Sequence, residues 1–99
     1  MNDVLYGDKD FQFTYEFQGK APIVHLTIDN WNKTSLKRMR EVMKLIVARF
    51  GAEGHDVLFA TTQDKKAVRL WNLVLPADEI VPLKQGNTLV GWLGAWYTE

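Results

Sequence analysis

The chain has 99 residues, which suits one domain, and 46% of them are apolar and 24% charged, as in ordinary globular proteins. Twelve Lys and Arg residues balance twelve Asp and Glu residues, so the net charge is zero. We therefore do not expect a nucleic-acid partner, because such binders usually carry a basic excess. The chain has no cysteine, which excludes disulfides, thiolate metal sites and cysteine nucleophiles.

The start of the chain lacks the basic and apolar regions of a signal peptide. Its apolar runs are far shorter than the roughly 18 residues that a membrane span needs. We expect a cytoplasmic protein, or one packaged inside a virion, without membrane contact. Residues 1–99 are expected to form one domain, with the polar residues 1–10 as a loose N-terminal arm.

The first regular pattern is a hairpin. Residues 11–17 alternate between aromatic and polar side chains, which is typical of a half-buried strand. A turn at Gln18-Gly19-Lys20 leads to a β-branched strand over residues 23–29. Pro22 stands at the start of that strand, where the missing N–H is tolerated.

An amphipathic helix follows, with apolar residues at helical spacing between Leu36 and Phe50. Thr34 or Ser35 is the expected N-cap, and Gly51 is the expected C-terminal stop. The apolar run 57–60 then predicts a short central strand that is covered on both faces.

Asp64 is placed to cap a second helix, and Pro76 prevents that helix from continuing. Strands over 79–84 and 88–97 complete the chain, and Pro82 indicates an edge strand or a bulge. The predicted order is β-β-α-β-α-β-β. We expect an α+β fold with one mixed, mostly antiparallel sheet and two helices.

The segment Asp64–Trp71 reads D-K-K-A-V-R-L-W. It is similar to the N-x-x-A-I-R-L-Y helix of GCN5-related N-acetyltransferases (GNAT), with Ala67, Arg69 and Leu70 identical. The order of elements over residues 23–97 resembles the C-terminal portion of that fold. The resemblance implies acetyl-CoA as cofactor if the chain is an enzyme, with this helix beside the pantetheine arm.

The sequence departs from the GNAT pattern in its chemistry. The family cradles the pyrophosphate with a Q/R-x-x-G-x-G/A loop, whereas residues 31–38 contain no glycine. Trp71 replaces a tyrosine that in many members protonates the leaving thiolate, which an indole cannot do. The family's first strand and substrate-binding helices have no counterpart in this sequence. The candidate cofactor-binding residues are Lys33, Thr34, Ser35, Lys37, Arg38, Asp64 and Trp71.

Glu16 and Asp29 are candidate general bases, because this fold often places one on the corresponding hairpin. A His25–Asp29 dyad or metal site is an alternative, but no metal-binding motif surrounds either histidine, so we expect two unrelated histidines and no metal. Truncated, glycine-poor domains of this kind look like accessory and internal virion proteins of tailed bacteriophages.

Two surfaces remain as candidates for binding. A basic helix face, formed by Lys37, Arg38, Arg40, Lys44 and Arg49, is either a solvated face or a contact for phosphate, nucleic acid or an acidic protein. The last strand is apolar on both faces, which suggests contact with a protein partner or a second copy. Its interface candidates are Trp92, Trp96 and Tyr97.

These observations favour a non-catalytic GNAT-like binding or structural module that acts through protein–protein contacts. The alternative is a minimal acyltransferase that uses acetyl-CoA and acts mainly by positioning an acceptor amine.

Overall fold

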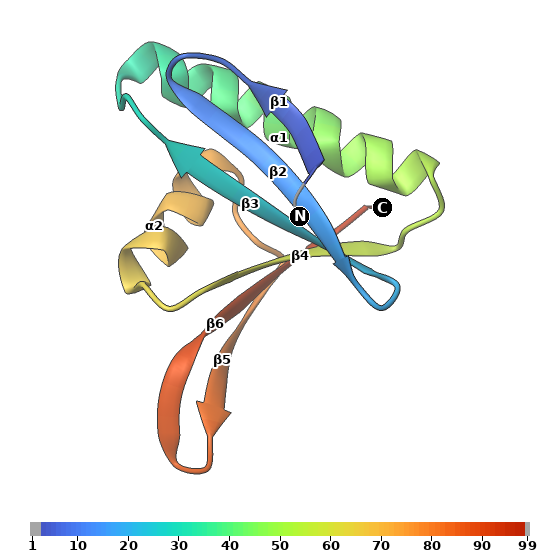
Figure 1. Cartoon of the computed structure of the whole chain (residues 1–99), viewed down its shortest axis with the longest axis vertical. Helices are drawn as coiled ribbons and strands as arrows, with labels where there is room; N and C mark the ends of the chain where they lie inside the picture. Colours follow the sequence, from blue (N-terminus) through green and yellow to red (C-terminus); the bar gives the residue numbers. More distant parts are fainter. Residues whose placement is uncertain (1–2, 99) are drawn as a thin grey trace.

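The computed structural model describes residues 3–98, which form one six-stranded mixed sheet and two helices (Figure 1). The strand order across the sheet is β1-β2-β3-β4-β6-β5. Strands β3 and β4 run parallel, and every other neighbouring pair is antiparallel. The α+β prediction is confirmed. The elements are β1 (Asp3–Gly7), β2 (Phe11–Gln18), β3 (Ala21–Ile28), α1 (Lys33–Ala52), β4 (Val57–Thr62), α2 (Lys65–Val74), β5 (Glu79–Gln85) and β6 (Thr88–Tyr97).

The expected loose arm is wrong over its described part, because residues 3–7 form strand β1 at the edge of the sheet. Sequence pattern missed this strand because its residues D-V-L-Y-G do not alternate cleanly and lie among aspartates. The observed order is therefore β-β-β-α-β-α-β-β.

Helix α1 is capped by Asn32, and neither Thr34 nor Ser35 is the cap. The Asn32 side chain accepts a hydrogen bond from the Ser35 amide at 2.8 Å, and the Ser35 hydroxyl accepts one from the Asn32 amide at 3.0 Å. This reciprocal pair is a capping box with serine in place of the usual Glu or Gln. The helix also continues past Gly51, and Gly54 supplies the positive φ that follows its end.

Both helices pack on the same face of the sheet, which we call the helical face (Figure 1). The core between them contains Phe11 and Phe13 of β2, Met39 and Met43 of α1, and Val74 of α2. Strand β4 was expected to be covered on both faces, and this is wrong. Its alternate residues Leu58 and Ala60 are buried beneath the helices, whereas Val57 and Phe59 on the opposite face stay partly exposed.

The expected positions of two prolines are confirmed. Pro22 lies at the second position of β3, and Pro82 lies in the edge strand β5, next to a register shift between Leu83 and Lys84. Asp64 caps α2 as expected, accepting a hydrogen bond from the Lys66 amide at 2.9 Å. Among residues 3–98, no helix is long and apolar enough to cross a membrane.

Candidate functional site

The parallel strands β3 and β4 pair only where Ile23 meets Phe59, near the start of β3. Beyond that point the carboxyl ends of the two strands diverge, and α2 lies on the side of the opening (Figure 1). Each strand is held on its other side, β3 by β2 and β4 by β6. Because the chain passes directly from β3 to the start of α1, the opening also lies near that helix N-terminus. Ligands in sheets with parallel strands favour such carboxyl-end crevices, which makes the opening the first candidate site.

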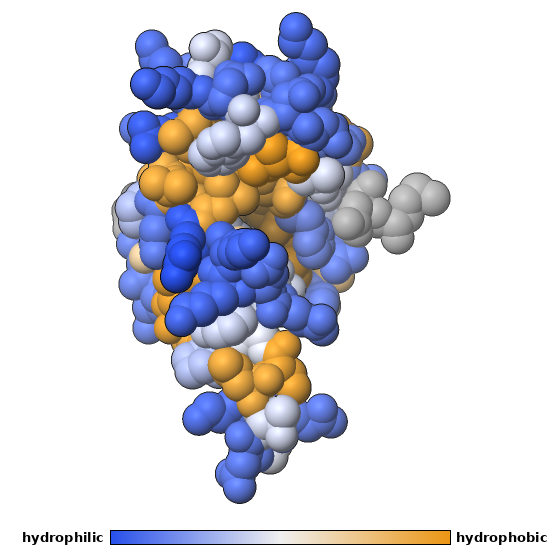
Figure 2. Space-filling model, turned by 90° about the vertical axis from the view of Figure 1, so that its left-hand side faces the viewer, coloured by the Kyte–Doolittle hydropathy of each residue, from blue (hydrophilic) through white to orange (hydrophobic). Residues whose placement is uncertain are grey.

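A small apolar cavity lies behind this opening. Its volume is about 30 Å³, which is close to the share of one water molecule in the liquid. Ligand pockets are usually roughly 300–1,000 Å³, so the cavity does not fit a pantetheine arm in this conformation. The lining residues are Phe13, Val24, Leu26, Met43, Ala60, Trp71, Val74, Leu75 and Trp96. Figure 2, which views the side on which α2 lies, shows an apolar hollow there between hydrophilic surfaces.

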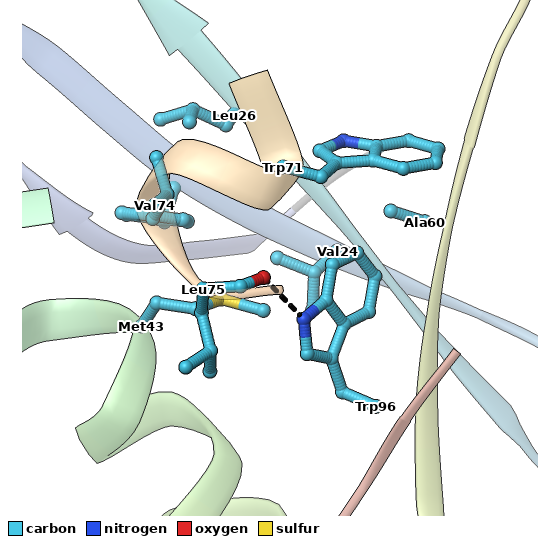
Figure 3. Close-up of a pocket in the computed structure, with 9 residues that line it drawn as sticks. Val24, Leu26, Met43, Ala60, Trp71, Val74, Leu75 and Trp96 are labelled. Carbon is cyan, nitrogen blue, oxygen red and sulfur yellow. Dashed lines mark hydrogen bonds between the residues drawn. The ribbon is translucent and has the colours of Figure 1, made fainter. Parts of the chain in front are cut away.

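Two indoles fill most of the space between the diverging strands and α2 (Figure 3). The Trp71 and Trp96 rings meet edge to face with centroids 5.6 Å apart, and Trp96 Nε1 donates to the Leu75 carbonyl at 2.8 Å. Gly94 makes room for both rings, because a Cβ there would lie 2.9 Å from an atom of each indole. Trp71 therefore fills this site and does not serve as a proton donor.

The first turn of α1 supplies few free groups for a phosphate. The Ser35 side chain is fully buried, and its hydroxyl donates to the Asn32 carbonyl at 2.9 Å while it closes the capping box. Lys33, Thr34 and Lys37 are exposed there. Of the proposed phosphate contacts, the structure leaves these three available and engages Ser35 within the chain.

Arg38 is also engaged within the chain. Its guanidinium donates to Asp10 at 2.6 Å and to Asp8 at 3.2 Å, and it lies 5.6 Å from the centre of the Phe11 ring. Asp8 accepts further hydrogen bonds from the Tyr6 hydroxyl at 2.8 Å and from the Asp10 and Phe11 amides at 2.7 and 3.1 Å. This cluster fastens the β1–β2 turn to α1.

Desolvation in this cluster acts to raise the pKa of Asp8. The hydrogen bonds from the Asp10 amide, the Tyr6 hydroxyl and the Phe11 amide, together with the charge of Arg38, outweigh it and lower that pKa to about 2. The hydrogen bond to Asp10 contributes most to the raised pKa of Arg38. Asp8 and Arg38 are therefore an ion pair at every pH at which the protein is expected to work.

The two candidate bases lie apart. Glu16 is on the face of the sheet away from the helices, where its carboxylate is 3.4 Å from His25 Nε2. Asp29 follows the end of β3 and donates its amide to the Asp10 carbonyl at 2.7 Å. The His25–Asp29 dyad does not form, since His25 faces Glu16 instead. His55 packs against Phe17 and Phe50. No group of three potential metal ligands occurs within residues 3–98.

The β5–β6 hairpin projects from the body of the molecule (Figure 1). Trp96 was expected at an interface, and this is wrong, because it is 3% exposed and lies in the chain's own core. Trp92 is half-buried, and Tyr97 is exposed, with its hydroxyl hydrogen-bonded to Glu79. Four other large apolar residues of the hairpin are exposed, namely Ile80, Val81, Leu89 and Val90.

Sequence reasoning missed four residues that shape the candidate site and its surroundings. Asn32 was overlooked because hydroxyl residues stood two and three positions later, although an N-x-x-S pattern signals a cap equally well. Asp8 and Asp10 gave no signal, since their partner Arg38 lies about thirty residues away along the chain. The role of Gly94 depends on two tryptophans from different elements.

Comparisons of the chain with protein-family models, with curated proteins and with solved structures find no match.

Proposed function

We propose that the chain is a non-catalytic binding module that self-associates through its β5–β6 hairpin. The observation that carries the proposal is the exposure of apolar side chains on both faces of a hairpin that projects from the domain (Figure 1). Ile80 and Val81 are consecutive in β5, opposite Gly94 and Leu93, so their side chains lie on opposite faces, and Leu89 and Val90 lie beyond the register shift near the hairpin turn.

The outer part of this hairpin has little support of its own. Strand β5 is an edge strand that pairs with β6 alone, and β6 pairs with β4 only over residues 92–97. A two-stranded ribbon is at best marginally stable in water, and contiguous exposed apolar patches mark interaction sites. A covering partner would stabilise this part of the sheet.

The charge pattern favours a second copy as that partner. Residues 80–97 carry one charged side chain, Lys84, in a chain that is 24% charged overall. Two such surfaces meet with little repulsion in a two-fold dimer, where each patch contacts itself. Pro82 and Lys84 hinder edge-to-edge pairing of β5, because proline lacks an N–H and a lysine on an edge opposes strand addition. The hairpins are therefore expected to pack face to face.

The state of the crevice between β3 and β4 is consistent with a scaffold role. Trp71 fills it, Ser35 and Arg38 bind within the chain, and residues 31–38 contain no glycine. Helix α1 connects the parallel strands β3 and β4, which diverge beyond Ile23. This arrangement supports a GNAT-like origin of the scaffold. A role as an accessory or virion protein of a tailed phage fits a GNAT-like fold without catalysis.

Sedimentation equilibrium tests self-association. The wild type is expected to dimerise at micromolar concentration, and Val81→Lys combined with Leu89→Lys is expected to be monomeric. Leu45→Lys is the matched control, since Leu45 is 70% exposed on α1. A wild type that stays monomeric at several hundred micromolar, or a dimer that the hairpin variant leaves intact, would overturn the proposal.

A second candidate is the minimal acyltransferase, favoured by the diverging parallel strands next to the α1 N-terminus. Lys33 and Lys37 would contact the phosphates of acetyl-CoA, and Asp29, which follows the end of β3, would be the base. Glu16 lies instead at the closed end of the strand pair, on the outer face of the sheet. The Trp71 side chain must first move out of the crevice. Calorimetric titration of acetyl-CoA into the wild type and into Trp71→Ala tests this, with Lys33→Ala combined with Lys37→Ala as the site control. No heat with either the wild type or Trp71→Ala excludes this function.

A further inference from the structure

Charge is divided sharply between the two helices and the rest of the sequence. The helices α1 and α2 contain nine of the twelve Lys and Arg residues and one acidic residue, Glu41. The rest of the sequence contains three basic and eleven acidic residues, so the helices carry a net charge of +8 and the rest of the sequence carries −8. The zero net charge of the chain therefore conceals a strongly basic layer.

Two of these nine cations are neutralised within the chain. Arg38 binds Asp8 and Asp10, and Arg49 binds Glu53 at 3.1 Å. The other seven are exposed and make no salt bridge with any residue between 3 and 98. They are Lys33, Lys37, Arg40 and Lys44 of α1 and Lys65, Lys66 and Arg69 of α2.

The four cations of α1 are spaced by four, three and four residues, so they form one stripe along the helix. With a rise of about 1.5 Å per residue, the stripe is about 16 Å long. Arg40 Nε donates to the Leu73 carbonyl at 2.8 Å, so this side of α1 is the one that adjoins α2. The α1 stripe therefore lies beside the C-terminal end of α2, and Figure 2 shows hydrophilic surface above and below the apolar hollow on the side where α2 lies.

An exposed aromatic residue stands at one end of the stripe. Trp31 is 52% exposed, belongs to no part of the core, and comes two residues before Lys33. An exposed indole beside a row of cations combines the two elements that recognise single-stranded nucleic acid, namely phosphate neutralisation and base stacking. An acidic protein would bind the cations but would offer no base on which Trp31 could stack.

We propose that the helical layer binds single-stranded nucleic acid, with the α1 stripe following the phosphates and Trp31 stacking on a base. Sequence-independent contact is expected, since lysines address phosphates and a stacked indole accepts any base. This proposal does not depend on the hairpin, which lies on other elements.

Fluorescence anisotropy with a labelled 20-nucleotide oligo(dT) tests the proposal. With about four phosphates neutralised, the Kd is expected to rise about 50-fold between about 50 and 200 mM salt. Combining Lys33→Gln, Lys37→Gln and Lys44→Gln is expected to weaken binding at least about tenfold and to lower the salt slope by about 2. The matched control is Lys9→Gln, Lys20→Gln and Lys84→Gln, which changes the net charge equally outside the helices and is expected to bind as the wild type does.

Trp31 separates nucleic acid from other polyanions. Trp31→Ala is expected to weaken oligo(dT) binding about tenfold, Trp31→Phe is expected to restore most of it, and inorganic polyphosphate is expected to compete poorly. The proposal is overturned if the wild type does not bind at low salt, if both lysine triples have equal effects, or if polyglutamate or duplex DNA binds as tightly as oligo(dT) and Trp31→Ala changes nothing.

Discussion

Trp71 of α2 and Trp96 of β6 meet edge to face, with ring centroids 5.6 Å apart and ring planes inclined by 78°. Aromatic pairs in this geometry attract beyond their buried area, because the positive ring edge faces the negative ring surface. The pair closes the space that the diverging strands β3 and β4 leave between them (Figure 3).

Trp71→Ala is expected to destabilise the protein by about 2–4 kcal/mol, because it removes this contact and leaves a cavity beneath α2. Trp71→Phe is expected to cost less, since a ring remains. Urea unfolding followed by circular dichroism measures both. Trp31→Ala, at an exposed tryptophan, is the control and is expected to change the free energy of unfolding by less than about 0.5 kcal/mol. Equal losses in the free energy of unfolding for Trp71→Ala and Trp31→Ala would show that Trp71 does not fill the crevice in solution.

Gly94→Ala is expected to cost about 1–3 kcal/mol, since its Cβ would lie 2.9 Å from both indoles. In a Trp71→Phe background the cost is expected to fall, because the smaller ring yields space. A double-mutant cycle from urea unfolding measures this coupling. Gly7→Ala is the matched control, because the nearest atom to its Cβ is 3.5 Å away. An additive cycle would show that Gly94 is not shaped by Trp71.

Asn32→Ala is expected to destabilise the protein by about 1 kcal/mol, because the Ser35 amide loses its acceptor at the start of α1. Thr34→Ala is expected to be nearly neutral, since Thr34 is exposed and does not cap the helix. Thermal unfolding of both variants distinguishes the observed cap from the one that the sequence suggested. A larger loss of thermal stability for Thr34→Ala than for Asn32→Ala would favour Thr34 as the helix cap.

Acid stability is expected to depend on Asp8. The pKa of its folded-state carboxyl is about 2, below the ordinary value of 3.8, so the ionised form stabilises the fold above pH 3.8. This contribution is lost as the pH falls from about 3.8 towards 2. Asp8→Asn is expected to lower the Tm at pH 7 and to flatten the fall in Tm within that range. Asp3→Asn is the control, at an exposed residue of β1. An unchanged acid profile for Asp8→Asn would show that the hydrogen bonds from Asp10, Tyr6 and Phe11 and the charge of Arg38 do not stabilise the Asp8 carboxylate in solution.

Local patterns in the sequence determined most elements of the fold. Alternation of Phe11, Phe13, Tyr15 and Phe17 predicted β2, helical spacing predicted α1, and Asp64 and Pro76 bounded the second helix. These signals are readable because each depends on residues within a few positions of one another. Strand β1 was not predicted, because the sequence of an edge strand with mixed exposure shows little periodic pattern.

The tertiary structure alone decided which side chains of the candidate site remain free. The sequence suggested Arg38 as a phosphate ligand, but in the fold it binds Asp8 and Asp10, which lie some thirty residues away along the chain. The sequence suggested Trp96 as an interface residue, but in the fold its N–H donates to the Leu75 carbonyl. The zero net charge likewise conceals the net charge of +8 on the two helices, and only the tertiary structure places both helices on one face of the sheet. The sequence by itself determined local conformation, because hydrogen bonds and burial repeat over short periods. Long-range partners, and hence the groups available for function, were decided only when the sheet brought distant residues together.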